Sequence, residues 1–260
     1  MPAWAVASVA YFIYIAVVAA ALRGLTPLAR TRAMVGAASG ALLAVLGSWA
    51  TDFWLRVVVL PPMTLLVAYW CSGWLWVSPM KRIEGFFIRS DLRLRVPQAA
   101  ARLPRAASEL LELAYAGIYL LIPVALVLHL SHAPKPDADR FWTVILVTDF
   151  ICFGMLPWVQ TRPPRTLDAG PPWRSTLRHF NLRLLGETSI GVNTVPSGHA
   201  AEALAVALLL TGAPWPVAAS MWLAALAVSA GAVLGRYHFA LDAAAGWAVA
   251  LAVWTLVAVR

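Results

Sequence analysis

A histidine and an aspartate near the end of the chain have the spacing of a paired acid and base. His238 and Asp242 stand four residues apart in the stretch 236–242 (RYHFALD), so on a helix their side chains would lie on one face. A carboxylate held against one imidazole nitrogen fixes the tautomer and leaves the other nitrogen free as a nucleophile. A structural pair that holds a helix end would have the same spacing.

The stretch 195–199 (VPSGH) opens an apolar run and is typical of a helix start. Ser197 is the expected N-cap, and the free N–H groups and positive dipole of such an end bind anions. Gly198 lets the backbone approach a phosphate closely, and His199 would lie in the first turn beside it. Taken alone, Ser-Gly-His also suits an ordinary helix cap.

A third cluster contains two arginines, and one more arginine lies beside His238. Arg162 and Arg165 lie in the stretch 161–165 (TRPPR), and Arg236 precedes His238 by two residues. A guanidinium group is a permanent cation with several N–H donors, so these arginines are candidates for a site at the membrane face. Arg162 and Arg165 could instead be basic residues that anchor a span at the membrane face.

The composition shows what kind of scaffold must position these residues. Apolar residues of the AVILMFWYC class make up 61% of the 260 residues, and only 12% are charged. A soluble domain carries about a quarter charged residues, because water must solvate its surface. The sequence therefore predicts an integral membrane protein. The net charge of +8 favours anionic lipid head groups and phosphorylated substrates as partners, and we expect no nucleic-acid partner.

About 20 apolar residues cross the hydrocarbon core of a bilayer as a helix. A run of 33 uncharged residues, 203–235, is too long for one span, and the turn signal Gly-Ala-Pro-Trp-Pro at 212–216 divides it. Pro61 and Pro62 should kink or delimit the third run. The expected fold class is all-α, a polytopic membrane helical bundle of about eight transmembrane helices from the runs 2–22, 33–51, 57–80, 113–134, 141–161, the two halves of 203–235, and 243–259.

Two segments are expected to lie outside the spans. Residues 81–108 mix arginine with Phe, Ile and Leu, which fits an interfacial helical stretch. Residues 162–196 form the longest polar connection, and its polar side chains could shape a head-group pocket or simply be solvated: His179, Asn181, Arg183 and Glu187. With eight spans, both segments share a face that carries 16 of the 20 basic residues, so the positive-inside rule places this face in the cytoplasm.

Two acids and two cysteines in or beside the apolar runs need a separate interpretation. Asp149 lies in the middle of an apolar run, where an acid is costly and is a functional candidate by default, although an interhelical hydrogen bond or a protonated acid would also explain it. Glu202, three residues after His199, could tune that histidine or simply favour the helix dipole. Cys71 and Cys152 fall inside apolar runs and are interpreted as small core residues.

The order of the motifs resembles that of the type 2 phosphatidic acid phosphatase family, which shares its catalytic core with the vanadium haloperoxidases. An arginine-proline element, then PSGH, then HxxxD followed by Gly246 covers about residues 60–260. The resemblance implies a six-helix catalytic core, which we place at 53–260 with the interfacial segment 81–108 and a catalytic loop at 162–199. Residues 1–52 would then form two additional N-terminal transmembrane helices.

The resemblance also implies a reaction through a phosphohistidine, without a metal or other cofactor. His238 would attack phosphorus and Asp242 would orient it. His199 would protonate the leaving oxygen and then activate water. The phosphate oxygens would be held by Arg162, Ser197 and Gly198, with Arg165 and Arg236 as further candidates. The substrate would be a lipid phosphate or an isoprenoid diphosphate in the bilayer, and the protein would lie in a bacterial plasma membrane.

The sequence departs from the family pattern at two positions that usually carry phosphate-binding cations. Met155 stands where the first motif has a lysine, and Ala232 stands where the third motif has an arginine. The form Arg-Tyr-His-Phe-x-x-Asp resembles the branch that contains sphingomyelin and inositol phosphorylceramide synthases, so a phosphotransferase that uses an alcohol acceptor is one alternative. A non-enzymatic lipid-binding membrane protein is the other.

Overall fold

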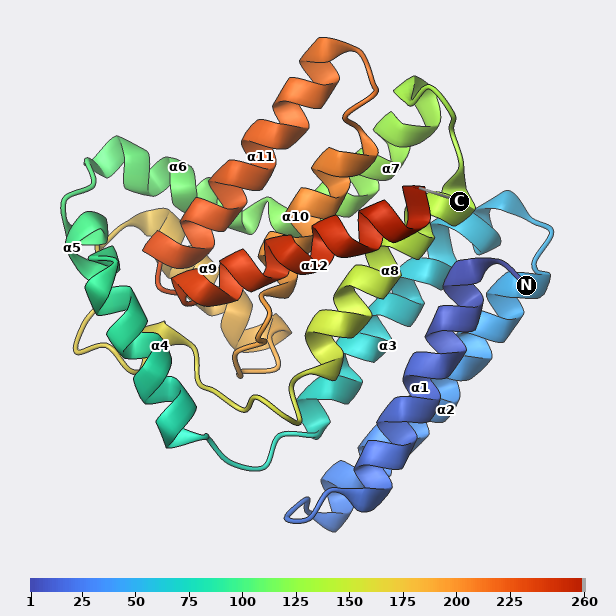
Figure 1. The fold of residues 1–260 in the computed structure, drawn as a ribbon, viewed down its shortest axis with the longest axis horizontal. Coiled ribbons are helices and arrows are strands. Elements are labelled where there is room, and N and C mark those ends of the chain that lie inside the picture. The colour runs from blue at the N-terminus through green and yellow to red at the C-terminus, as the bar shows by residue number, and fades with distance from the viewer. Residues whose placement is uncertain (259–260) are drawn as a thin grey trace.

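The computed structural model describes residues 1–258 and places helices over most of them, with no strand in this range (Figure 1). The expected all-α fold is confirmed. Val259, the expected end of the last span, lies outside the described residues. The α-helices are α1 (Ala3–Ala21), α2 (Pro27–Trp49), α3 (Leu60–Trp74), α4 (Lys81–Arg93), α5 (Val96–Ala101), α6 (Arg105–Ala116), α7 (Ile118–His132), α8 (Ala138–Gly154), α9 (Thr176–Thr188), α10 (Gly198–Leu209), α11 (Trp215–Leu234) and α12 (Ala240–Ala258).

Each of the eight expected apolar runs forms a helix, but the runs differ in length. Within residues 1–258, five helical segments are long and apolar enough to cross a membrane, and α6 with α7 would make a sixth if the bent pair is one span. The helices α8 and α10 are shorter, at 17 and 12 residues. This is a polytopic membrane bundle in which the helix that carries the PSGH motif is one of the short ones, whereas the third motif lies between two long helices, α11 and α12.

Two backbone features shape these segments. Pro61 and Pro62 begin α3 and are preceded by a π-helical turn, Trp54–Val59, so the expected kink is a change of helix type within one span. The chain bends by 63° between α6 and α7, at Gly117, which the apolar pattern of 113–134 did not reveal. The connection 162–196 is not all loop either, because α9 lies within it.

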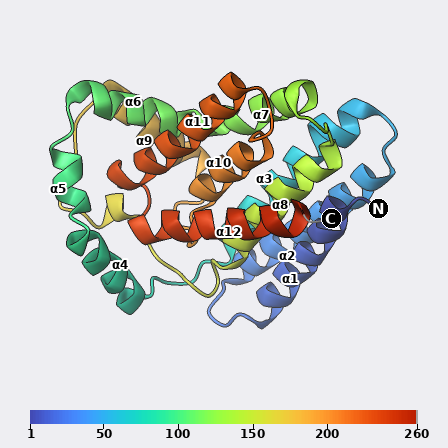
Figure 2. The ribbon, with the colours of Figure 1, turned by 45° about the horizontal axis from the view of Figure 1, so that its top comes forward.

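The helix α10 lies at the centre of the bundle, against α7, α8, α11 and α12 (Figures 1 and 2). Ten of its twelve residues are buried, which agrees with a sequence that is apolar on all sides apart from His199 and Glu202. On the N-terminal side, α1, α2 and α3 pack together, and α1 also packs against α8. The motif that opens α10 is therefore held by the most enclosed helix of the protein.

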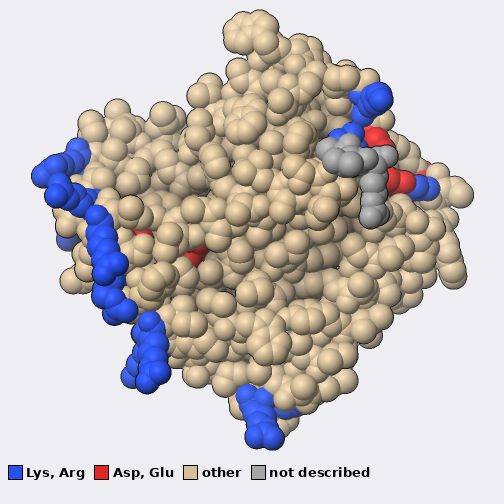
Figure 3. Space-filling model, in the orientation of Figure 1, with Lys and Arg blue, Asp and Glu red and all other residues tan. Residues whose placement is uncertain are grey.

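The helix α4 turns its two acids inward and its cations outward. Glu84 and Asp91 are buried, whereas the basic side chains along α4 and at the two ends of α5 are exposed and form a line on the edge of the molecule (Figure 3). Exposed Phe86 and Leu92 lie among them. An amphipathic helix with such a surface suits the interface between lipid and water, as expected for 81–108.

Gly246 allows α12 to cross α10 at close range. A Cβ built at Gly246 would lie 2.5 Å from the Ser197 carbonyl oxygen and 3.2 Å from the Ala201 backbone nitrogen. These are backbone atoms of the PSGH turn and the first turn of α10, so they cannot move aside as a flexible side chain would. The close approach explains why the third motif includes a glycine at this position.

We expect Gly246→Ala to lower the free energy of unfolding by about 1–3 kcal/mol through overpacking and to displace Ser197. Gly186→Ala in α9 is the matched control, because nothing lies within 4 Å of its Cβ and alanine stabilises a helix interior by roughly 0.5–1 kcal/mol over glycine. Thermal unfolding of the purified proteins, followed by size-exclusion chromatography, measures both. Equal melting temperatures for the two variants would contradict the close crossing.

Candidate active site

The two motif histidines meet although they come from different helices. His199 lies in the first turn of α10 and His238 lies in the turn between α11 and α12. Their ring centroids are 5.7 Å apart, with the ring planes at 51°. The fold thus brings together two imidazoles that are 39 residues apart in sequence, as a two-histidine reaction requires.

Asp242 faces the Nδ1 atom of His238 across the N-terminus of α12. The distance from Nδ1 to Asp242 Oδ2 is 3.7 Å, which is longer than a hydrogen bond. Asp242 Oδ2 also accepts hydrogen bonds from Asn193 Nδ2 at 2.7 Å and from the Phe239 N–H at 3.0 Å. His238 itself precedes α12, so the two residues meet at a helix end and not on one helix face as expected. The Nε2 atom is the nitrogen left for chemistry.

The PSGH turn caps α10 as expected. The Ser197 hydroxyl accepts a hydrogen bond from the Ala200 N–H at 3.4 Å, and the Ser197 N–H donates to the Asp242 carbonyl oxygen at 2.9 Å. Among the described residues, the N–H groups of Gly198 and His199 have no acceptor. The start of α10 therefore offers two free donors beside the imidazoles, where a phosphate oxygen could bind.

Burial lowers the pKa of His238 to about 3, and the charge of Arg165 contributes in the same direction. Both effects disfavour the positively charged imidazolium. Because the pKa lies below the ordinary value near 6.5, the ring stays neutral as the pH falls from 8 to 5. A neutral imidazole is the form that can act as a nucleophile.

This neutrality can be measured by NMR on protein with isotope-labelled histidine. We expect the His238 resonance, assigned by its absence in His238→Gln, to keep the chemical shift of a neutral ring from pH 8 to pH 5. The same titration on the urea-denatured protein serves as the control, because a histidine in an unfolded chain has a pKa of about 6.5. A midpoint for His238 between pH 5 and pH 8 in the folded protein would contradict the assignment.

Arg162 is held by a carboxylate of the interfacial helix. Its Nε and Nη2 atoms donate to the two oxygens of Glu84 at 3.0 and 2.9 Å, and its backbone N–H donates to Glu84 Oε1 at 2.8 Å. These hydrogen bonds hold the pKa of Glu84 below its ordinary value. The Arg162 side chain is still 44% exposed, so part of the guanidinium remains open to a ligand.

Arg236 is enclosed more completely. Its guanidinium donates to Asp91 and to Asp168, with the Nε to Asp168 Oδ2 distance at 2.7 Å, and the side chain is only 3% exposed. Its φ of 62° is in the left-handed region, which costs energy for any residue with a Cβ. The two carboxylates stabilise this conformation. The turn at Arg236 in turn sets the direction of the backbone that leads to His238.

Arg165 is the motif arginine without a carboxylate partner among residues 1–258. Its backbone N–H donates to the Arg236 carbonyl oxygen at 2.8 Å. Its guanidinium lies 5.8 Å from the centroid of the Tyr237 ring, and its charge acts on His238. A phosphate between the histidines would find this cation available.

The two departures from the family pattern have different surroundings. Ala232 is fully buried in a cluster with Tyr115, Leu185 and Tyr237, so aromatic rings fill the space next to the position where the family has an arginine. Met155 is 38% exposed and lines an apolar groove between α1 and α8. Neither position brings a cation to the histidines.

Asp149 lies next to the site in a fully buried position. Among the described residues neither of its carboxylate oxygens has a hydrogen-bond partner, and Oδ1 would lie 3.5 Å from a Cβ at Gly198. An interhelical hydrogen bond therefore does not explain it.

In the 162–196 connection Asn181 is buried, whereas three other polar side chains are exposed: His179, Arg183 and Glu187.

The sequence left several site residues unidentified. Glu84, Asp91 and Asp168 bind the motif arginines, and Asn193 binds both Asp242 and Thr161. Glu84 and Asp91 could have been identified from the sequence. They are the two acids in a basic helical stretch, 81–93, and they lie seven residues apart, so they share one helix face. Asp168 and Asn193 lie in irregular chain, where no periodicity indicates a side chain's direction.

The comparisons with known proteins agree with the arrangement of the motifs. No curated protein and no solved structure matches the chain. A family model described as the PAP2 superfamily matches residues 90–256, a range that contains the two histidines, Asp242 and the three motif arginines. On this match over more than half of its length, the chain belongs to the PAP2 superfamily.

Proposed function

We propose that this protein hydrolyses a lipid phosphate or an isoprenoid diphosphate through a phosphohistidine on His238. Membership of the PAP2 superfamily supports a phosphatase-type activity on lipid phosphates. The single observation that carries the mechanism is the pair of imidazoles 5.7 Å apart, one with Asp242 at its Nδ1 atom. A nucleophile and a proton carrier on either side of a phosphate would have this relation.

In the first step His238 Nε2 attacks phosphorus and forms the N–P bond. Burial, His238 and Arg165 lower the pKa of His199 to about 3 in the protein without substrate, so His199 takes up its proton together with the anionic phosphate. The bond from phosphorus to the leaving oxygen then breaks, and His199 donates this proton to that oxygen. Asp242 stabilises the positive charge that develops on the His238 ring. The free N–H groups of Gly198 and His199, with the Ser197 hydroxyl proton, bind the phosphoryl oxygens, where charge accumulates in the transition state.

In the second step water attacks phosphorus opposite the N–P bond. His199, now neutral, accepts the proton of the water, and the N–P bond breaks to release phosphate. Both histidines then return to their starting protonation states. We propose that no metal takes part, so turnover should persist in the presence of EDTA.

The three arginines would contribute unequally. Arg165 is the principal phosphate ligand, because no carboxylate holds it in the described chain. Arg162 contributes through the part of its guanidinium that Glu84 leaves exposed. Arg236, enclosed by Asp91 and Asp168, acts through the turn that carries His238. All three remain in the phosphate-binding set, with Arg165 contacting the ligand most directly.

Phosphate release from a panel of lipid phosphates and isoprenoid diphosphates tests the function. The purified protein is assayed beside His238→Ala in the same detergent or nanodisc. Release that disappears in the variant supports a phosphatase and begins to identify its substrate. If a new phospho-ester forms on addition of an acceptor alcohol in place of free phosphate, the protein is a transferase of the branch that its third motif resembles. Absence of both products favours a lipid-binding protein.

We also propose that the site lies on the cytoplasmic face of a plasma membrane, on the strength of the basic residues on its side of the protein. His179→Cys gives a reporter at an exposed position of α9, and the natural Cys71 and Cys152 are fully buried. We expect a membrane-impermeant thiol reagent to label the variant only after intact cells are permeabilised. Labelling in intact cells would place the site on the outer face.

A further inference from the structure

The histidine assigned to proton transfer has no hydrogen bond that could orient it. His199 makes none to any described residue, whereas His238 has Asp242 at its Nδ1 atom. Three rings surround His199: Tyr115 is stacked at 5.3 Å and 23°, Tyr119 is edge-on at 6.3 Å, and His238 lies at 5.7 Å. An imidazole with only ring contacts rotates about χ2 unless a stacked ring restrains it.

Tyr115 can provide this restraint only if it is itself fixed. Its ring stacks on Tyr237 with the centroids 3.9 Å apart and the planes at 5°, and both tyrosines are almost fully buried. They pack with Leu185 and Ala232 in one cluster. The three rings of Tyr237, Tyr115 and His199 thus form a continuous stack, and Tyr237 is the residue directly before His238.

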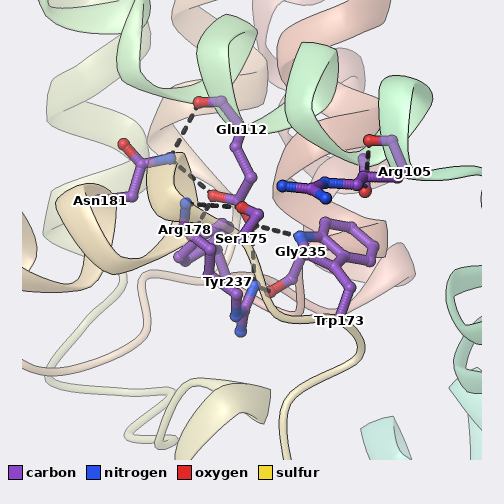
Figure 4. A network of polar contacts seen from close by, with 9 residues as sticks. Arg105, Glu112, Trp173, Ser175, Arg178, Asn181, Gly235 and Tyr237 are labelled. Atoms are coloured by element: carbon purple, nitrogen blue, oxygen red, sulfur yellow. Dashed lines mark hydrogen bonds and ion pairs between the residues drawn. The ribbon is translucent and has the colours of Figure 1, made fainter.

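Glu112 anchors the far end of this stack (Figure 4). The Tyr237 hydroxyl donates to Glu112 Oε2 at 2.6 Å. Arg178 Nη1 donates to Oε1 at 3.0 Å and to the Gly235 carbonyl oxygen at 2.9 Å, which fixes the backbone two residues before Tyr237. Trp173 Nε1 donates to Oε1 at 2.9 Å.

Four side chains donate hydrogen bonds to the Glu112 carboxylate and hold it in place. Glu112 and Arg178 are both buried, and hydrogen bonds from further side chains help to offset the cost of burying such a pair. Asn181 Nδ2 supplies one of these, at 2.6 Å from Glu112 Oε2. Burial and the charge of Glu112 raise the pKa of Tyr237, so its hydroxyl stays protonated and continues to donate.

We propose that Tyr115 and Tyr237, anchored by Glu112, are positioning residues that hold His199 at the angle needed for proton transfer. This inference rests on the proposed function in so far as it assigns proton transfer to His199. The same anchor fixes the turn that carries His238, so one network sets the relative position of both imidazoles. Tyr115 lies against His199 as the Asp242 carboxylate lies against the Nδ1 atom of His238.

A pair of substitutions at Tyr115 separates ring stacking from other effects. Tyr115→Leu removes the ring, and we expect kcat to fall about 10²-fold with little change in KM, as for a displaced catalytic group. Tyr115→Phe keeps the ring and should restore most of kcat, because the Tyr115 hydroxyl has no hydrogen bond among the described residues. Tyr237→Phe keeps the stack but loses the bond to Glu112, and we expect kcat to fall about fivefold. Size-exclusion profiles control for folding.

A second measurement does not depend on turnover. Diethyl pyrocarbonate modifies accessible imidazoles, and peptide mass spectrometry gives the rate at each histidine. We expect Tyr115→Leu to speed modification of His199 several-fold, Tyr115→Phe to leave it unchanged, and the exposed His179 to react equally in all proteins. If the wild-type protein released no phosphate, the proposed function would fail while this rate still tested the stack. An unchanged His199 rate in Tyr115→Leu, or equal defects in both Tyr115 variants, would overturn the inference.

Discussion

Replacement of His238 by alanine is expected to reduce phosphate release from the preferred lipid substrate by about 10⁴-fold or more, because the nucleophile is lost. The protein should still fold. His238 Nδ1 has no hydrogen bond in the described structure, and the backbone N–H of residue 238, which donates to the Ala232 carbonyl oxygen at 2.9 Å, remains in the variant. The substitution should therefore lower the rate of the chemical step without disturbing the turn that carries residue 238.

His179→Ala is the matched control for this prediction. It makes the same substitution at an exposed histidine of α9 and should retain wild-type turnover. Incubation with substrate labelled in the phosphoryl group, followed by alkaline denaturation, should trap label on the wild-type protein and none on His238→Ala. Undiminished turnover in His238→Ala would end the proposed mechanism.

The sequence predicted the all-α membrane fold because that inference depends on composition and on the length of apolar runs, which the bilayer constrains strongly. The individual spans were predicted less well. The bend at Gly117 joins two helices whose residues are apolar throughout 113–134, so hydropathy carries no sign of it. The end of α8 at Gly154 is likewise set by the turn that leads to Arg162 and not by any change in polarity.

For the site, adjacent residues were predictable and distant partners were not. The cap of α10 by Ser197 follows from local chemistry. By contrast, Glu112 and Tyr237 lie 125 residues apart, and their contact depends on how α6 packs against α9 and α11. From the sequence, Arg162 and Arg236 were interpreted as cations free to bind phosphate. Their ion pairs with Glu84, Asp91 and Asp168 depend on how the helices pack and could not be predicted.

His199 provides the second large effect, and it differs in kind from the loss of His238. A proton carrier contributes about 10²–10⁴-fold, so His199→Ala should reduce turnover of a lipid phosphate, whose alkoxide leaves poorly, by roughly that factor. An aryl phosphate with an acidic phenol needs no proton on its leaving oxygen. With that substrate the first step should therefore stay fast in His199→Ala, provided that the compound reaches the site.

The second step still needs His199 to accept a proton from water, whatever group has left. With the aryl phosphate, His199→Ala should accordingly release one equivalent of phenol in a rapid burst and then accumulate phosphohistidine on His238, stable to alkali and labile to acid. The double variant His199→Ala/His238→Ala should show no burst. If His199→Ala released phenol without a burst and as slowly as His238→Ala does, His199 would not act as the acid of the first step and the base of the second. The stack of Tyr115 and Tyr237 would then hold a ring that only binds phosphate.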